Sequence, residues 1–202
     1  MATAIYKPEA ADVKRLREET GAGMIDCRNA LVATGGDFEK AKVQLTEQGI
    51  AKAAKKAERV ANEGLVGSYI HPGGKIGVLV ELNCETDFVA RNARFIELVR
   101  DLAMHVAAMG PEYLDRDSVP PEVADSIRSD FAKAVPAGKP PAVAEKIVEG
   151  KMNKWYEAHV LLDQQFVKDD AITVAELIAG TSGVLGERLR VRRFVRFALA
   201  EE

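Results

Sequence analysis

Apolar residues recur at helical spacing over the first 50 positions of this 202-residue chain. Val13 and Leu16 lie three positions apart, and the glycines that follow at Gly21 and Gly23 are typical of a capped helix end. Two further apolar stripes follow, made of Met24, Cys27, Leu31 and Val32, then of Phe38, Ala41 and Leu45. The pattern predicts three short helices, the last ending at Gly49, that close into a small bundle.

An alanine- and lysine-rich stretch, residues 50–64, comes next. Alanine and lysine are strong helix formers, but the stretch has few large apolar side chains with which to anchor a helix. It therefore predicts a solvated linker helix between two modules.

From residue 64 the apolar pattern changes to a period of two. Two apolar runs flank His71-Pro72-Gly73-Gly74, which is the signal of a β-hairpin. Helical spacing then returns until Gly110-Pro111 stops it, with an apolar stripe of Phe95, Leu98, Val99, Leu102, Val106 and Met109.

Residues 120–155 favour a projecting helical hairpin, because prolines open each arm and a thin apolar stripe follows each. The rest of the chain predicts a strand, a short helix and a last strand over about 189–198. This order predicts an α+β fold with an antiparallel sheet and packed helices. We expect an N-terminal docking module over 1–55 and a core domain over 56–202.

Composition supports a buried core, with 47% hydrophobic and 29% charged residues, and the net charge is only −3. No apolar run reaches the ~18 residues of a membrane span, and the N-terminal sequence is unlike a signal peptide. The two cysteines, Cys27 and Cys84, form no CxxC motif. We therefore expect a cytoplasmic protein that binds no membrane.

Enzyme signatures are scarce. The sequence has no phosphate-binding P-loop, and its histidines, at positions 71, 105 and 159, lack the spacing of a zinc site. Cys84 as a nucleophile paired with a distant histidine is an alternative, but a half-buried strand thiol suits its context better. We expect no enzyme, no cofactor and no metal site.

The most informative segment runs from Glu81 to Asn92, where a strand gives way to a helix. In one interpretation Thr86, Asp87 or Asn92 caps the helix, and Phe88 is tucked under the sheet. In the other, Phe88 is an exposed anchor for a pocket on a partner protein. The residues by themselves leave both open.

Two long strings carry a resemblance to a known family. VKRLREETGAGMIDCRNAL at 13–31 and IGVLVELNCETDFVARN at 76–92 closely resemble the translation elongation factor Ts family in its short bacterial form. Shorter strings at 139–155, 164–170 and 191–197 are also similar to that family. The resemblance covers nearly the whole chain in order.

The resemblance implies guanine-nucleotide exchange on the GTPase elongation factor Tu, which releases GDP without covalent chemistry. It also implies that residues 1–55 form a docking module akin to ubiquitin-associated domains. Arg17, Met24 and Ile25 match partner contacts of the family, and the alternative for Met24 and Ile25 is core packing.

The resemblance further implies that Thr86, Asp87, Phe88 and Val89 form the motif linked to dislodging the partner's Mg²⁺. His105 matches another partner contact of the family. A partly buried histidine with its hydrogen bonds satisfied is an equal alternative at that position.

Long members of the family carry two similar core subdomains, whereas the pattern here leaves room for one. We therefore expect a homodimer that engages two GTPase molecules. A nucleic-acid-binding module is a rival interpretation, based on five arginines near the C-terminus, at positions 188, 190, 192, 193 and 196. The acidic middle of the chain, with 12 basic against 20 acidic residues over 61–187, speaks against direct nucleic-acid binding.

Overall fold

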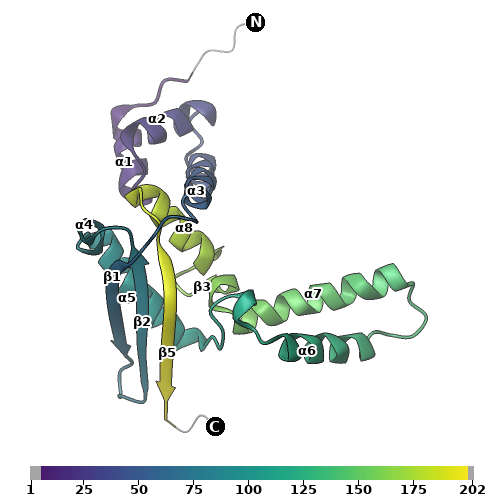
Figure 1. Cartoon of the computed structure of the whole chain (residues 1–202). Helices are drawn as coiled ribbons and strands as arrows, with labels where there is room; N and C mark the ends of the chain where they lie inside the picture. Colours follow the sequence, from purple (N-terminus) through teal and green to yellow (C-terminus); the bar gives the residue numbers. More distant parts are fainter. Residues whose placement is uncertain (1–5, 200–202) are drawn as a thin grey trace, which may run out of the picture. The chain divides into compact units, whose positions relative to one another are not determined.

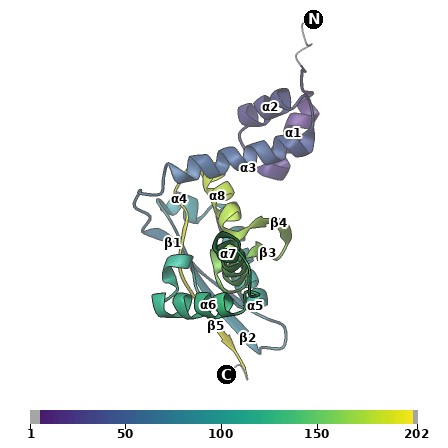
Figure 2. The same ribbon diagram turned by 90° about the vertical axis from the view of Figure 1, so that its right-hand side faces the viewer.

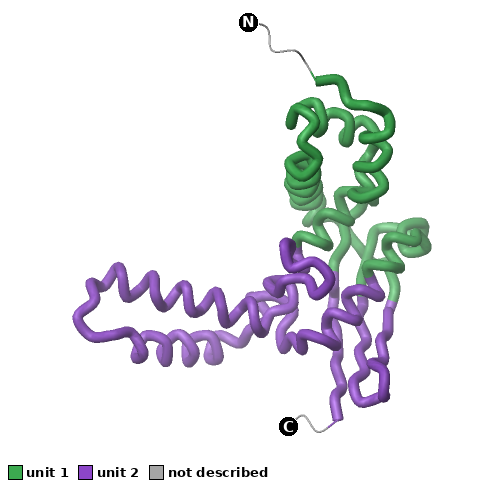
Figure 3. The backbone as a smooth tube through the Cα atoms, turned by 180° about the vertical axis from the view of Figure 1, so that it is seen from behind, with its two compact units in different colours: residues 1–65, 82–98, 176–190 green, residues 66–81, 99–175, 191–202 purple. Residues whose placement is uncertain are grey.

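The computed structural model describes residues 6–199. These residues form eight α-helices, two short 3-10 helices and five strands, in the expected α+β order (Figure 1). The chain divides into two compact units, the first made of residues 1–65, 82–98 and 176–190, and the second of residues 66–81, 99–175 and 191–202 (Figure 3). Each unit gathers segments that lie far apart in the sequence.

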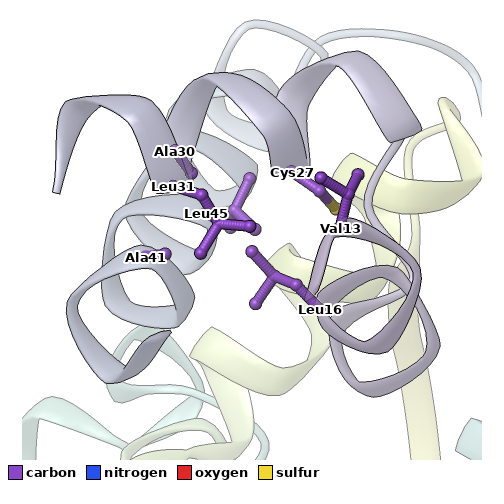
Figure 4. Packing of buried hydrophobic residues seen from close by; sticks show 7 residues of the cluster. All are labelled: Val13, Leu16, Cys27, Ala30, Leu31, Ala41 and Leu45. Carbon is purple, nitrogen blue, oxygen red and sulfur yellow. The ribbon is translucent and has the colours of Figure 1, made fainter. Parts of the chain in front are cut away.

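The first unit contains a bundle of α1 (Ala10–Thr20), α2 (Met24–Ala33) and α3 (Phe38–Ala54). Gly21 ends α1 in the left-handed conformation, with φ 71°, and its N–H donates to the Arg17 carbonyl over 2.7 Å. The buried core comprises Val13, Leu16, Cys27, Ala30, Leu31, Ala41 and Leu45 (Figure 4). The predicted bundle is confirmed, while its likeness to ubiquitin-associated domains stays a prediction.

The prediction that the third helix ends at Gly49 is wrong. α3 continues to Ala54, and no separate linker helix forms between Ala54 and the first strand. Gly49 lies inside α3 and contacts α8 (Val174–Leu185) (Figure 2). A Cβ atom at Gly49 would lie 3.3 Å from the Cα of Gly180. Glycine at this position serves helix packing instead of ending the helix.

A three-stranded sheet has the order β1 (Glu63–Ile70), β2 (Ile76–Cys84) and β5 (Arg190–Ala198). Neighbouring strands run in opposite directions (Figure 1). In the turn between β1 and β2, Gly73 and Gly74 have positive φ angles of 96° and 69°. The predicted hairpin and C-terminal strand are both confirmed.

Within the second unit the two faces of this sheet differ. On one face Val78 and Val80 are buried, and Gly67 meets α5 (Ala93–Met109), where an added Cβ would lie 2.1 Å from Val99 Cγ1. Side chains of a strand alternate between faces, so the neighbouring residues point to the opposite side. That side exposes five large apolar residues, Val66, Ile70, Leu79, Val195 and Phe197. We call these five residues the outer sheet face.

The second unit also holds an antiparallel pair of helices, α6 (Pro121–Lys133) and α7 (Pro141–His159), which pack side by side (Figures 1 and 2). A proline at the first position of each helix suits that site, where its missing N–H costs no hydrogen bond. α6 buries no residue fully, and α7 buries Val148 and Met152. The hairpin predicted over 120–155 is confirmed.

The strand expected after this hairpin is much shorter than predicted. α7 runs on to His159, a 3-10 turn covers Leu161–Asp163, and only β3 (Gln165–Phe166) pairs with β4 (Asp169–Thr173). The backbone here is satisfied locally, since the Gln164 N–H donates to the Val160 carbonyl over 3.2 Å. Local turns therefore take the hydrogen bonds that a longer strand would need. A second 3-10 turn covers Arg116–Ser118.

Candidate partner-binding site

The Thr86–Val89 segment forms one helical turn, α4 (Asp87–Ala90), after the end of β2 at Cys84. Thr86 caps this turn, because its Oγ1 accepts a hydrogen bond from the Val89 N–H over 3.4 Å. The Thr86 carbonyl also accepts from the Ala90 N–H over 3.2 Å. Of the three candidate caps Thr86, Asp87 and Asn92, Thr86 is the residue that caps α4.

Phe88 points away from the protein. Phe88 is 85% exposed, whereas Ala90, two positions further along the same turn, is 5% exposed. The turn therefore buries its alanine side and presents the aromatic ring on the other. The interpretation in which Phe88 is tucked under the sheet is wrong, because Ala90 occupies the inward position.

Asp87 and Val89 flank the ring on the same turn. Asp87 is exposed and pairs with Arg91 through an Oδ2–Nη2 distance of 2.9 Å, while Val89 is half-buried. An ion pair between two exposed side chains contributes little to stability, of order 0–1 kcal/mol. The Asp87 carboxylate thus remains accessible for contact with another molecule.

Two acidic residues that sequence reasoning missed lie against this turn. Glu187 accepts hydrogen bonds from residues 85 and 86, and Glu85 accepts one from the Arg188 N–H. The two segments are separated by about a hundred positions, so no local sequence pattern signals the contact. Only a comparison of many related sequences could have indicated that the two positions belong together.

Cys84 lies directly before the turn and is buried. Burial, together with the nearby charge of Glu187, raises the pKa of the Cys84 thiol to about 11. Its Sγ donates to the Thr86 carbonyl over 3.1 Å. A thiol that stays protonated is a poor nucleophile, so the geometry favours the strand thiol over the hydrolase alternative.

A second group of predicted residues lies where α1 passes into α2. Arg17 is exposed near the end of α1, and Met24 and Ile25, which begin α2, are 49% and 74% exposed. The bundle core is filled by other residues of the same helices (Figure 4). Core packing, the alternative for Met24 and Ile25, is therefore wrong, and the structure brings all three residues to the surface around one helix junction.

Arg94, in the first turn of α5, reaches this junction. A Cβ atom at Gly21 would fall 1.9 Å from Arg94 Nη1, so the guanidinium occupies the space beside this glycine. Gly21 therefore satisfies two requirements, its positive φ angle and the close approach of Arg94. This contact ties the segment that carries α4 to the junction of α1 and α2 within the first unit.

His105 is fully buried in the second unit. Its Nδ1 accepts from the Val167 N–H over 3.2 Å, so the proton sits on Nε2, which donates to Gln164 Oε1 over 3.0 Å. Burial lowers the pKa of this histidine. The arrangement is that of a neutral histidine with both ring nitrogens satisfied, and a partner contact at His105 stays a prediction.

Four of the five arginines behind the nucleic-acid interpretation make contacts within the protein. Arg192 and Arg193 both pair with Glu81, at 3.4 and 2.8 Å, and Arg196 Nε donates to the Ala107 carbonyl. Arg188 donates to the Arg59 carbonyl. The charge of these four arginines is therefore partly shared with acceptors inside the protein.

Neither a metal nor a membrane is indicated by the described part of the chain. Between residues 6 and 199, no group of three or more histidine, cysteine or acidic side chains could hold a metal ion. In the same range, no helix is both long and apolar enough to cross a bilayer.

An aromatic ring exposed on a capped turn and apolar side chains exposed at a helix junction suit contact with another protein and point to the class of binding proteins. Comparison with known sequences identifies the family within that class. The family profile described as Elongation factor TS matches residues 39–201.

Relatives match over nearly the whole chain. Elongation factor Ts of Geobacter metallireducens is 54% identical over 193 residues, which is 95% of this chain and 89% of the relative. Those of Koribacter versatilis and Coprothermobacter proteolyticus are 53% and 51% identical over 95% of this chain, and over 88% and 98% of their own lengths. The chain therefore belongs to the elongation factor Ts family, and its role lies in translation elongation.

Proposed function

We propose that this chain is a guanine-nucleotide exchange factor for the GTPase elongation factor Tu. It binds the GTPase, displaces its Mg²⁺ and promotes GDP release, so that GTP can bind. The observation that carries the proposal is the outward position of Phe88, 85% exposed on a capped turn. Burying such a ring in a partner's pocket contributes roughly 1.5–3 kcal/mol of binding free energy.

The physical basis is the sensitivity of a bound Mg²⁺ to geometry. The ion holds GDP through the phosphates and requires near-ideal octahedral oxygen ligands at about 2.0–2.1 Å. A rigid apolar ring that shifts the elements carrying those ligands weakens the ion's hold on the nucleotide. Phe88 serves as this wedge, with Thr86 and Val89 forming its turn, and Asp87 holds the pose or disturbs the ligands of the ion.

Exchange of this kind needs no covalent step and no cofactor. If the factor and GDP each weaken the other's binding to the GTPase by the same coupling free energy, a ternary complex forms and either ligand can leave. The interface must then replace the lost nucleotide contacts, so it should be extensive, on the order of 2,000 Å² or more.

A second contact supplies binding free energy away from the wedge. Arg17, Met24 and Ile25 form an exposed cationic and apolar surface suited to docking on the GTPase. His105 contributes to this binding indirectly, through Val167. The Val167 N–H donates a hydrogen bond to the His105 ring, and Val167 itself is 44% exposed. The reaction belongs to the cytoplasm, with neither nucleic acid nor a membrane as direct partner.

The outer sheet face supports a homodimer that engages two GTPase molecules. It places exposed Val66, Ile70, Leu79, Val195 and Phe197 on one side of three neighbouring strands. A sheet face of this composition is stabilised by packing on a second sheet, as in sandwich folds with layers ~10 Å apart. A second copy of the chain supplies such a sheet.

The experiment that tests the exchange function is release of labelled GDP from elongation factor Tu in a stopped-flow instrument. We expect Phe88→Ala to lower the maximal release rate by about tenfold or more, because the wedge is lost. Val60→Ala removes part of another exposed apolar side chain (72%) and should leave the rate unchanged. If Phe88→Ala matches the wild type at saturating factor, the role of Phe88 as the wedge is wrong. If the wild-type chain does not accelerate release, the proposed function is wrong.

A further inference from the structure

The turn that carries Phe88 has little support of its own. α4 spans only Asp87–Ala90, and a single helical turn is unstable in isolation because its nucleation is unfavourable. The ring cannot fix the turn by packing, since it is 85% exposed. Burial of Ala90, which is 5% exposed, decides which side of the turn faces inward, and hydrogen bonds to the segment that leads into the turn hold it in that orientation.

The carboxylate of Glu187 makes most of those hydrogen bonds. Its Oε2 accepts from the backbone N–H groups of Glu85 and Thr86, each over 3.0 Å, and its Oε1 accepts from Thr86 Oγ1 over 2.6 Å. Hydrogen bonds to an ionised acceptor are short and strong. Both oxygens of one side chain are thus committed to the two residues that precede α4.

The bond to the Thr86 hydroxyl extends to the turn itself. Because this hydroxyl donates its hydrogen to Glu187, its lone pairs remain to accept from the Val89 N–H, 3.4 Å away. Without Glu187, the hydroxyl hydrogen is free to rotate and the cap loses its fixed orientation. Glu187 therefore acts on Phe88 through Thr86.

A reciprocal contact holds the two segments together. Glu85 Oε1 accepts from the Arg188 N–H over 2.6 Å and from Arg59 Nη1 over 3.4 Å. The hydrogen bond from the Arg188 backbone is the main cause of a lowered pKa at Glu85. Residues 85 and 86 and residues 187 and 188 are thus joined by bonds that run in both directions.

Glu187 is itself held at the end of α8. Its carbonyl accepts from Ser182 Oγ over 2.5 Å, and Gly186, with φ 79°, donates its N–H to the Ser182 carbonyl over 3.0 Å. Ser182 is buried. The carboxylate is therefore fixed by a helix end before it contacts the turn.

From these contacts we propose that Glu187 is a positioning residue for nucleotide exchange, which holds the Thr86 cap and thereby the direction of Phe88. The inference rests on the proposed function. It assigns to this carboxylate an effect on the maximal rate of GDP release and not on docking of the GTPase, because the surface around Arg17, Met24 and Ile25 lies on other elements.

The test uses the full chain in four variants, Glu187→Ala, Glu187→Gln, Thr86→Val and Thr86→Ser. Labelled GDP release from elongation factor Tu is measured over a range of factor concentrations. Glu187→Ala and Thr86→Val should each lower the maximal rate by about tenfold while the half-saturating concentration changes little. Thr86→Ser keeps the hydroxyl and should lower the maximal rate much less than Thr86→Val does, and Glu187→Gln should be intermediate because it keeps one acceptor oxygen.

Coupling gives a second readout. If Glu187 acts through Thr86, the Glu187→Ala/Thr86→Val double variant should be no slower than either single variant, whereas independent effects would multiply. Amide hydrogen exchange over residues 86–90 should be faster in Glu187→Gln than in the wild type. Glu47→Gln, which removes a charge from an exposed site on α3, should change neither measurement.

The outcomes separate this inference from the proposed function. If the wild-type chain does not accelerate GDP release, the exchange function fails whatever Glu187 does. If Phe88→Ala slows release but Glu187→Ala and Thr86→Val keep the wild-type maximal rate, the positioning role is refuted. A rise in half-saturating concentration at an unchanged maximal rate would also refute it. Should Glu187→Ala fail to fold, Glu187→Gln and Thr86→Val decide the matter by the same criteria.

Discussion

Gly183 of α8 lies so close to Gly49 of α3 that a side chain at position 183 would meet the backbone of Gly49. A Cβ atom at Gly183 would fall 2.7 Å from the Cα of Gly49 and 3.0 Å from its carbonyl oxygen. The atoms in the way belong to the backbone, so they cannot move aside as the end of a flexible side chain can. This contact attaches the N-terminal bundle to α8 within the first unit.

Gly183→Ala is therefore expected to destabilise the protein by about 1–3 kcal/mol, the usual cost of overpacking a tight contact. Urea unfolding followed by circular dichroism measures the change. Gly150→Ala is the matched control, because Gly150 lies inside α7 with no atom within 4 Å of an added Cβ. That substitution should stabilise by about 0.5–1 kcal/mol through helix propensity. Equal stability of Gly183→Ala and the wild type would contradict the glycine contact.

The pH dependence of stability should carry the signature of His105. Burial lowers its pKa in the folded state below the ordinary value near 6.5. Between the two pKa values the unfolded chain binds more protons than the folded one, so the free energy of unfolding rises with pH. The contribution of His105 to the free energy of unfolding should be fully present above about pH 6.5. The free energy of unfolding should fall as the pH drops below that value.

Urea unfolding at several pH values between about 5 and 7.5 tests this expectation. His105→Leu should be less stable at neutral pH, because Gln164 and the Val167 N–H lose their partner, but its stability should vary less with pH in this range. His71→Gln, at an exposed position, should keep the wild-type pH dependence. An unchanged slope in His105→Leu would assign the pH dependence to other groups.

The predicted homodimer can be tested at the outer sheet face. Phe197 is 69% exposed there, so Phe197→Glu should alter the folded monomer little but should place a charge inside a sheet-to-sheet interface. Light scattering should give a mass of two chains for the wild type at micromolar concentration and of one chain for the variant. Val60→Glu, an exposed position in the first unit, should remain a dimer. A single-chain mass for the wild type would disprove the homodimer.

The sequence predicted helices and strands correctly where the apolar residues follow a single period, either helical or alternating. The α1–α3 bundle, the β1–β2 hairpin and the α6–α7 pair each follow from apolar spacing with glycine or proline at the ends. It failed at Gly49, because a glycine that ends a helix and a glycine that lets two helices touch look alike in one sequence. Only the position of Gly183, far along the chain, distinguishes them.

In the candidate site, too, some features could be predicted from the sequence and others depend on the tertiary fold. The sequence indicated Thr86 as a cap and Phe88 as the residue of interest, but whether the ring points inward or outward depends on Ala90 taking the buried position. Glu187 could not be found, because its contact with Thr86 spans 101 positions. Hydrogen bonds of this range are determined by the tertiary fold, and no local pattern encodes them.

Dependence on Mg²⁺ gives the most direct test of the wedge. If the factor accelerates GDP release by displacing the ion, removing Mg²⁺ beforehand with EDTA already speeds GDP release. The factor then has less acceleration left to add. The fold-acceleration by the wild type should therefore shrink in EDTA, and the difference between the wild type and Phe88→Ala should shrink with it.

Ile25→Asp supplies the matched comparison for that measurement, because Ile25 is 74% exposed and belongs to the docking surface instead of the wedge. Its effect should be a raised half-saturating concentration, since an apolar contact is replaced by a charge, and this effect should be the same with and without EDTA. If the wild-type acceleration is identical in both conditions, the factor acts on contacts other than those of the ion. Phe88 would then have to loosen GDP by a route that bypasses Mg²⁺.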